Sequence, residues 1–159
     1  MDLRAHLLAT LDRAYDGRSW HGPNLKRALR GLTPAVAFFR PGPERHSAYD
    51  LALHVAYWKY VVRRRLSGEK RGSFALPGSN FFLAPPRPSA KEMAAAQSLL
   101  EREHRALREL VEELPERAFS ARFGRWTGEA MLSGAAAHDL YHAGQIQLLR
   151  KLFAEGRKR

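Results

Sequence analysis

Apolar residues recur along most of the chain at intervals of three and four positions, which is the period of an amphipathic α-helix. The first such stretch predicts a helix over residues 2–16. Two shorter helical pieces are expected at 24–32 and 34–39. The second of these begins with Thr33 and Pro34, an N-cap residue followed by proline at the first helical position. The N-terminal part therefore contains one long helix and two short ones.

Three longer helices follow, and each begins at a serine or threonine suited to an N-cap. Ser47 and Ser89 are followed three residues later by Asp50 and Glu92, which is the arrangement of a capping box. The predicted helices cover 47–66, 89–114 and 127–153. Together with the first helix they make four long helices, and no segment shows the alternating pattern of a β-strand. The expected fold is therefore all-α, a four-helix bundle.

The connection between the second and third long helices, residues 67–88, is long and rich in proline and glycine. It shows no regular period, and loops of this length are usually lids, binding loops or crossovers. The topology of the bundle therefore need not be simple up-and-down. We expect a single domain over residues 1–159 that ends in a basic tail at 157–159.

Composition places the chain among soluble globular proteins. It has 159 residues, of which 45% are hydrophobic and 27% are charged. No apolar run reaches the roughly 18 residues of a membrane span, and charged residues interrupt the first helix as they would not interrupt a signal peptide. A cytoplasmic protein with no membrane partner is therefore expected. The absence of cysteine excludes disulfides and thiolate ligands, which leaves histidine and carboxylate as the metal ligands to consider.

A net charge of +11 raises the prospect of an anionic partner, including nucleic acid. Positive charge gathers at 63–65, at Lys70 and Arg71, and in the C-terminal tail. No nucleic-acid recognition motif accompanies this charge. Nucleic acid is therefore kept as an alternative partner and is not the favoured one.

Histidines on two of the predicted helices carry the strongest chemical signal. His138 and His142 are four residues apart, which places both imidazoles on one face of the last helix, about one turn apart. That face is otherwise apolar, so both rings point into the bundle, and His54 does the same on the 47–66 helix. Three inward imidazoles suit one divalent metal ion with an open coordination position. On the residues alone, ordinary core or surface histidines are an equally good interpretation.

Several motifs together resemble the DinB-like (DinB/YfiT) metalloenzyme superfamily. The run AAHDLYHAGQI at 136–146 resembles the signature of its last helix, and SAYDLALHVAYW at 47–58 resembles its second-helix motif. The segments WHGPNL at 20–25 and GLTP at 31–34 match its N-terminal half in order and spacing. The resemblance therefore covers nearly the whole chain.

The resemblance implies a four-helix bundle, one divalent metal ion bound by His54, His138 and His142, and a homodimer. Relatives include transferases and isomerases that use small thiols such as mycothiol or bacillithiol, so it also implies a low-molecular-weight thiol as cosubstrate. Three imidazoles and water suit Zn, Ni, Fe, Co or Mn, and the sequence does not choose among them.

Two functions are consistent with these features. The first is a metal-dependent enzyme, a thiol S-transferase or a hydrolase, in which the metal lowers the pKa of a bound thiol or water. No further catalytic residue is assigned. The second is a basic stress-response or nucleic-acid-associated binding protein in which the metal is structural. A metal in a pocket open to solvent, walled by Trp58 and residues 67–88, would favour the first function.

Several other residues have two interpretations each. Asp139 either orients a neighbouring imidazole or is a solvated charge. Tyr141 and Gln145 either line the pocket or pack in the core, and Trp58 is expected as a pocket wall or core residue. The remaining histidines are expected at the surface or in loops, with His46 nearest a pocket mouth: His6, His21, His46 and His104.

Overall fold

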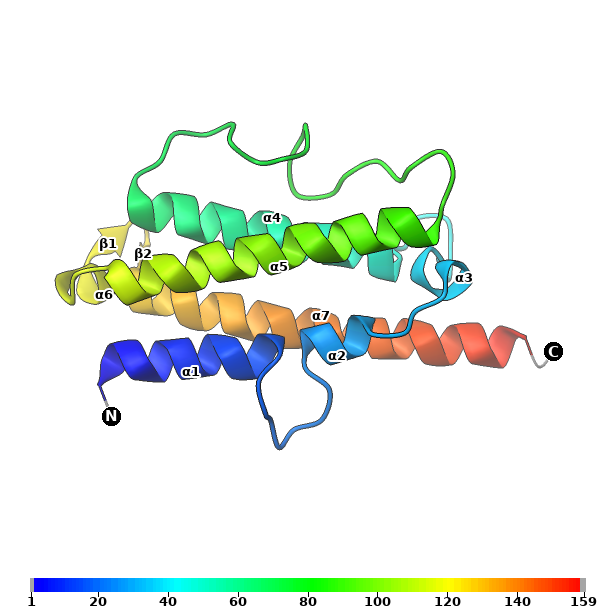
Figure 1. The fold of residues 1–159 in the computed structure, drawn as a ribbon, viewed down its shortest axis with the longest axis horizontal. Coiled ribbons are helices and arrows are strands. Elements are labelled where there is room, and N and C mark those ends of the chain that lie inside the picture. The colour runs from blue at the N-terminus through cyan, green and yellow to red at the C-terminus, as the bar shows by residue number, and fades with distance from the viewer. Residues whose placement is uncertain (1, 158–159) are drawn as a thin grey trace.

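Four long helices form the bundle in a computed structural model that describes residues 2–157. They are α1 (Leu3–Tyr15), α4 (Ala48–Ser67), α5 (Ala90–Glu113) and α7 (Gly128–Gly156). α4 packs against α5 and α7, and α1 packs against the same two helices. The expected all-α four-helix bundle is therefore confirmed (Figure 1). No helix in this part of the chain is long and apolar enough to cross a membrane.

The topology is not simple up-and-down. α1 and α7 run in one direction along the bundle, and α4 and α5 run in the other (Figure 1). Residues 68–89 travel back along the length of the bundle between α4 and α5, so these two neighbouring helices are parallel. The short helix α2 (Leu25–Leu29) continues the line of α1 along α7, and α3 (Pro34–Ala37) lies beside the start of α4.

The predicted caps set the starts of the long helices. The Ser47 hydroxyl accepts the backbone N–H of Asp50 at 3.2 Å, and the Asp50 carboxylate accepts the backbone N–H of Ser47 at 2.7 Å, so both halves of the capping box form. Ser89 and Thr127 each accept a backbone N–H from three residues on. These bonds satisfy N–H groups that have no partner within their own helix.

The connection between α4 and α5, residues 68–89, is packed against α4 instead of extending into solvent. Phe74 and Phe82 contact the ring of Tyr57, with ring centroids 5.3 and 5.8 Å apart. Asn80 has φ 64°, a conformation that asparagine tolerates better than most residues. We call residues 68–89 the strap.

A short hairpin between α5 and α7 departs from the expectation of no strands. After α6 (Arg117–Ser120), strands β1 (Arg122–Phe123) and β2 (Trp126–Thr127) pair antiparallel. Two residues are too few for an alternating pattern, so the sequence carries no signal that identifies such strands. The basic tail expected at 157–159 is described only at Arg157, and Lys158 and Arg159 lie outside the described residues.

Candidate metal centre

The three predicted histidines meet between α4 and α7. The Nε2 atom of His138 lies 3.1 Å from Nε2 of His54 and 3.0 Å from Nε2 of His142. One ring nitrogen from each residue lies within 4.8 Å of the other two. The inward placement expected from helical spacing is thus confirmed, with His54 and His142 buried and His138 partly buried. This group of three histidines can hold a metal ion.

Hydrogen bonds on the far side of two rings fix which nitrogen faces the centre. His54 Nδ1 lies 3.1 Å from the backbone carbonyl oxygen of Asn80, and His142 Nδ1 lies 2.7 Å from Oε1 of Gln145. Both partners are acceptors, so each Nδ1 carries the proton and donates it. Each Nε2 then presents a lone pair to the centre. Metal-ligating histidines have this arrangement, with a partner on the other ring nitrogen.

A proton alone cannot satisfy the three nitrogens. If Nε2 of His138 carried a proton, it could donate a hydrogen bond to His54 or to His142, which would leave one lone pair without a partner. A cation accepts all three lone pairs together. Zinc bound to nitrogen at about 2.0–2.1 Å places tetrahedral ligands about 3.3 Å apart, close to the two separations in this structure. The donor set therefore fits a divalent metal ion.

Burial keeps the three imidazoles neutral. Burial, together with the neighbouring rings of His142 and His54, lowers the pKa of His138 to about 3. Burial also lowers the pKa of His142 to about 4, against the opposing effect of the hydrogen bond with Gln145. The pKa of His54 is lowered by burial as well. Neutral imidazole is the form that binds metal, so the rings can act as ligands at neutral pH.

Aromatic side chains enclose the His54 side of the centre. The ring of Phe81 stacks on His54 with centroids 4.3 Å apart, and the exposed ring of His46 stacks on Phe81 at 3.7 Å. Trp58 meets both His54 and His138 edge-on, at 6.3 and 6.4 Å. Its indole N–H donates to the side-chain oxygen of Asn80 at 2.9 Å. Trp58 thus acts as a wall, and His46 lies at the margin, as the sequence indicated.

Among the polar residues behind the site, the expectation for His104 is wrong, and one of the two interpretations of Asp139 is excluded. His104 is buried instead of lying at the surface, and its ring stacks on Tyr15 at 3.9 Å. Asp139 is completely buried and is not a solvated charge. Both contact the ammonium of Lys59, which lies 2.6 Å from the Asp139 carboxylate and 3.3 Å from Nδ1 of His104. These contacts link α4, α5 and α7 directly behind His138.

Sequence reasoning did not identify Lys59 or Asn80. Lys59 lies one helical turn after Val55 on the buried face of α4, so its position carried a signal, but its charge suggested a solvent-exposed side chain. Asn80 lies in the strap, which has no helical or strand period from which the inward-facing residues could be predicted. Gln145 was correctly placed near the ligands, whereas Tyr141 is largely exposed.

The expected pocket is present and Trp58 borders it as predicted, but the second predicted wall differs. A cavity of about 390 Å³ between α4 and α7 is bordered by His138, Lys59 and Trp58. The strap does not border this cavity. It borders a neighbouring cavity of about 650 Å³ that reaches Trp58 and Asn80 but none of the three histidines. Trp58 therefore separates a cavity at the ligands from a cavity under the strap.

The fold is a helical bundle, and three imidazole nitrogens converge between two of its helices. These two features place the protein in the class of helical bundles that can hold one metal ion. A family model of the DinB superfamily matches residues 19–146, a range that includes all three histidines, and the chain belongs to this superfamily. A conserved protein from Enterococcus faecalis, known from its crystal structure, is similar in fold, with a TM-score of 0.70 and 18% identity. The similarity covers 98% of this chain and 99% of that chain. No curated protein matches the chain.

Proposed function

We propose that the protein binds one divalent metal ion through His54, His138 and His142 and uses it as an enzyme, to transfer a low-molecular-weight thiol or to hydrolyse a small substrate. One observation carries the proposal: three Nε2 lone pairs converge, and two of them are fixed there by Nδ1 hydrogen bonds on the opposite side of the ring. A divalent ion with an open position lowers the pKa of a bound thiol or water and so supplies a nucleophile near neutral pH.

In this proposal the surrounding residues orient the ligands and leave an opening for a substrate. Asn80 and Gln145 hold the rings of His54 and His142 in the binding orientation. The pair of Lys59 and Asp139 fixes the turn of α7 that carries His138. The cavity bordered by His138 gives a substrate access to the centre, which a closed structural site would lack.

A thiol cosubstrate agrees with the composition of the chain and with its family. The chain has no cysteine, so a reacting sulfur has to come from a second molecule. Membership of the DinB superfamily supports a metal centre, and thiol chemistry is the part of the proposal that requires a direct test. The competing function is a binding protein in which the metal only joins α4 to α7.

Cobalt substitution separates the two functions. The tag-free protein is stripped with a chelator, reloaded with Co²⁺ and titrated with small thiols. Thiolate binding at the open position is expected to add a sulfur-to-metal charge-transfer band in the near ultraviolet, and a His54→Ala variant should lose it. The matched control is His21→Ala, which removes an exposed histidine and should leave the band unchanged. Full cobalt loading with no spectral change for any thiol, and no hydrolase activity, would leave a structural metal.

A further inference from the structure

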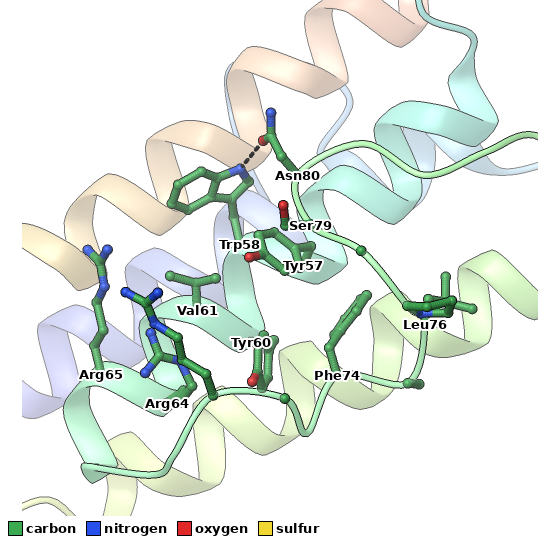
Figure 2. A pocket seen from close by; sticks show the side chains of 15 residues that line it. Tyr57, Trp58, Tyr60, Val61, Arg64, Arg65, Phe74, Leu76, Ser79 and Asn80 are labelled. Atoms are coloured by element: carbon green, nitrogen blue, oxygen red, sulfur yellow. Dashed lines mark hydrogen bonds between the residues drawn. The ribbon is translucent and has the colours of Figure 1, made fainter.

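Three cavities meet around Trp58 and Arg65. The first lies under the strap and the second lies against His138, with volumes of about 650 and 390 Å³. The third, of about 690 Å³, lies between the end of α4 and the β1–β2 hairpin. Trp58 and Arg65 border all three, and Figure 2 shows both side chains projecting from α4 beside the cavity under the strap. A ligand bound at His138 would therefore lie next to Arg65.

The three consecutive arginines near the end of α4 differ in whether a carboxylate is paired with them. Arg63 is paired, with Glu69 at 2.6 Å and Glu103 at 3.6 Å. Arg64 donates to the backbone carbonyl oxygen of Glu69, at 3.4 Å. Within residues 2–157, no carboxylate lies within 4 Å of the Arg65 guanidinium. Among the described residues, Arg65 thus presents an exposed positive charge without a counterion at the margin of the cavity that reaches His138.

The interior of that cavity is mainly apolar. Besides His138 and the buried Lys59, its walls are formed by aliphatic and aromatic side chains of α4, β2 and α7, including Val61, Val62, Trp126, Met131 and Ala135. Its volume of about 390 Å³ is within the range of small-molecule sites. The cavity therefore offers an apolar chamber with the candidate metal ligand at one wall and a free guanidinium at its edge.

We infer that the substrate acted on at this centre is an organic acid, whose apolar body fills the cavity between α4 and α7 and whose carboxylate is bound by Arg65. The inference rests on the proposed function, because it assigns the ligand of the same site. A guanidinium matches a carboxylate with two parallel hydrogen bonds, which an uncharged amide cannot reproduce. Arg65 is then the residue that selects acids over neutral molecules of the same shape.

The test uses ligands without a thiol and is made with chelator present, so that neither sulfur nor the carboxylate can bind a metal ion. Binding of 3-phenylpropanoate and 3-phenylpropanamide is followed by tryptophan fluorescence, because Trp58 and Trp126 border the cavity. A Trp20→Phe background removes the exposed third tryptophan. The acid is expected to bind about 10- to 100-fold more tightly than the amide, the strength of a charge-assisted pair.

An Arg65→Gln variant should abolish this preference while leaving the affinity for the amide unchanged. The matched control is Arg102→Gln, which removes one exposed positive charge from α5 and should preserve the preference. Equal binding of acid and amide to the unaltered chain would overturn the inference, as would an acid preference that survives in Arg65→Gln. Tighter binding of 2-phenylethyl phosphate than of the acid would overturn the assignment to carboxylates. A failure of the proposed function appears separately, as full cobalt loading with neither a cobalt–thiolate band nor hydrolase activity.

Discussion

Replacing Lys59 by methionine would leave the Asp139 carboxylate unpaired inside the bundle. In the structure, Lys59 and Asp139 are 1% and 0% exposed, and their charged atoms lie 2.6 Å apart. Within the part of the chain that the structure describes, one oxygen of Asp139 has no hydrogen-bond partner, so the ammonium is the principal group that compensates the buried charge. Methionine has nearly the same length as the lysine stem, and the change therefore removes charge with little change of shape.

The expected cost follows from this geometry. Removing one member of a buried ion pair costs about 3–5 kcal/mol. Burial already raises the pKa of Asp139, against the opposing effect of Lys59. Without Lys59 the carboxyl can take up a proton, which places the cost toward the lower end of that range. For a chain of 159 residues, an unfolding entropy of about 330 cal/mol/K converts 3–5 kcal/mol into a melting temperature lower by about 9–15 °C.

Urea and thermal unfolding with chelator present measure this cost without a contribution from bound metal. The double variant Lys59→Met, Asp139→Leu removes both charges together, and we expect it to recover most of the lost stability. The difference between the double variant and the sum of the single variants gives the coupling energy of the pair. Loss of less than about 1 kcal/mol in Lys59→Met, or single changes that simply add, would refute the claim that Lys59 compensates a buried carboxylate.

Three further predictions concern the buried His104, the partner of His142 and the start of α7. Burial lowers the pKa of His104 in the folded protein to about 2. In the unfolded chain its pKa is about 6.5, so between these two values only the unfolded chain takes up the proton. The free energy of unfolding therefore falls as the solution is acidified. Between pH 6.5 and 5 this loss of stability amounts to about 1.6 kcal/mol. Urea unfolding of His104→Gln should lack that loss, and an equal pH dependence in both proteins would contradict the prediction. Gln145→Leu should weaken metal binding about 10- to 100-fold in chelator competition, because it removes the acceptor of His142, whereas an unchanged affinity would exclude that role. Gly128→Ala should cost about 1–3 kcal/mol, because its Cβ would lie 2.3 Å from the Ala118 carbonyl oxygen, whereas Gly144→Ala meets no atom within 4 Å and should not destabilise the chain.

Local rules were sufficient to predict the helices and their starts. Ser47, Ser89 and Thr127 each form the expected N-cap, since capping depends only on residues within one turn. Among the described residues, the Ser47 capping box is complete, whereas the Glu92 side chain does not return the bond to Ser89. The β1–β2 hairpin was not predicted, because strands of two residues carry no period. The parallel arrangement of α4 and α5 was also beyond reach: the length of the connection permits a crossover but does not require one.

Local sequence rules also predicted the three ligands of the candidate site, but not the residues that hold them in place. Helical spacing alone places His138 and His142 on one face, and the apolar stripe of α4 places His54 inward. The residues that hold those rings could not be predicted from helical spacing. Asn80 acts through a backbone oxygen, which no side-chain pattern reports. Lys59 and Asp139 are each unfavourable when buried alone, and only their contact across two helices explains why both are inside.

The most direct test of the central claim is the metal content of the tag-free protein, measured by elemental analysis. We expect about one equivalent of divalent metal per chain, since the three imidazoles form one site. His54→Ala should lower the occupancy, and the double variant His138→Ala, His142→Ala should abolish it. The exposed histidines serve as controls, and His6→Ala with His21→Ala should retain the full equivalent. Full occupancy in the His138→Ala, His142→Ala protein would contradict the assignment of the metal centre.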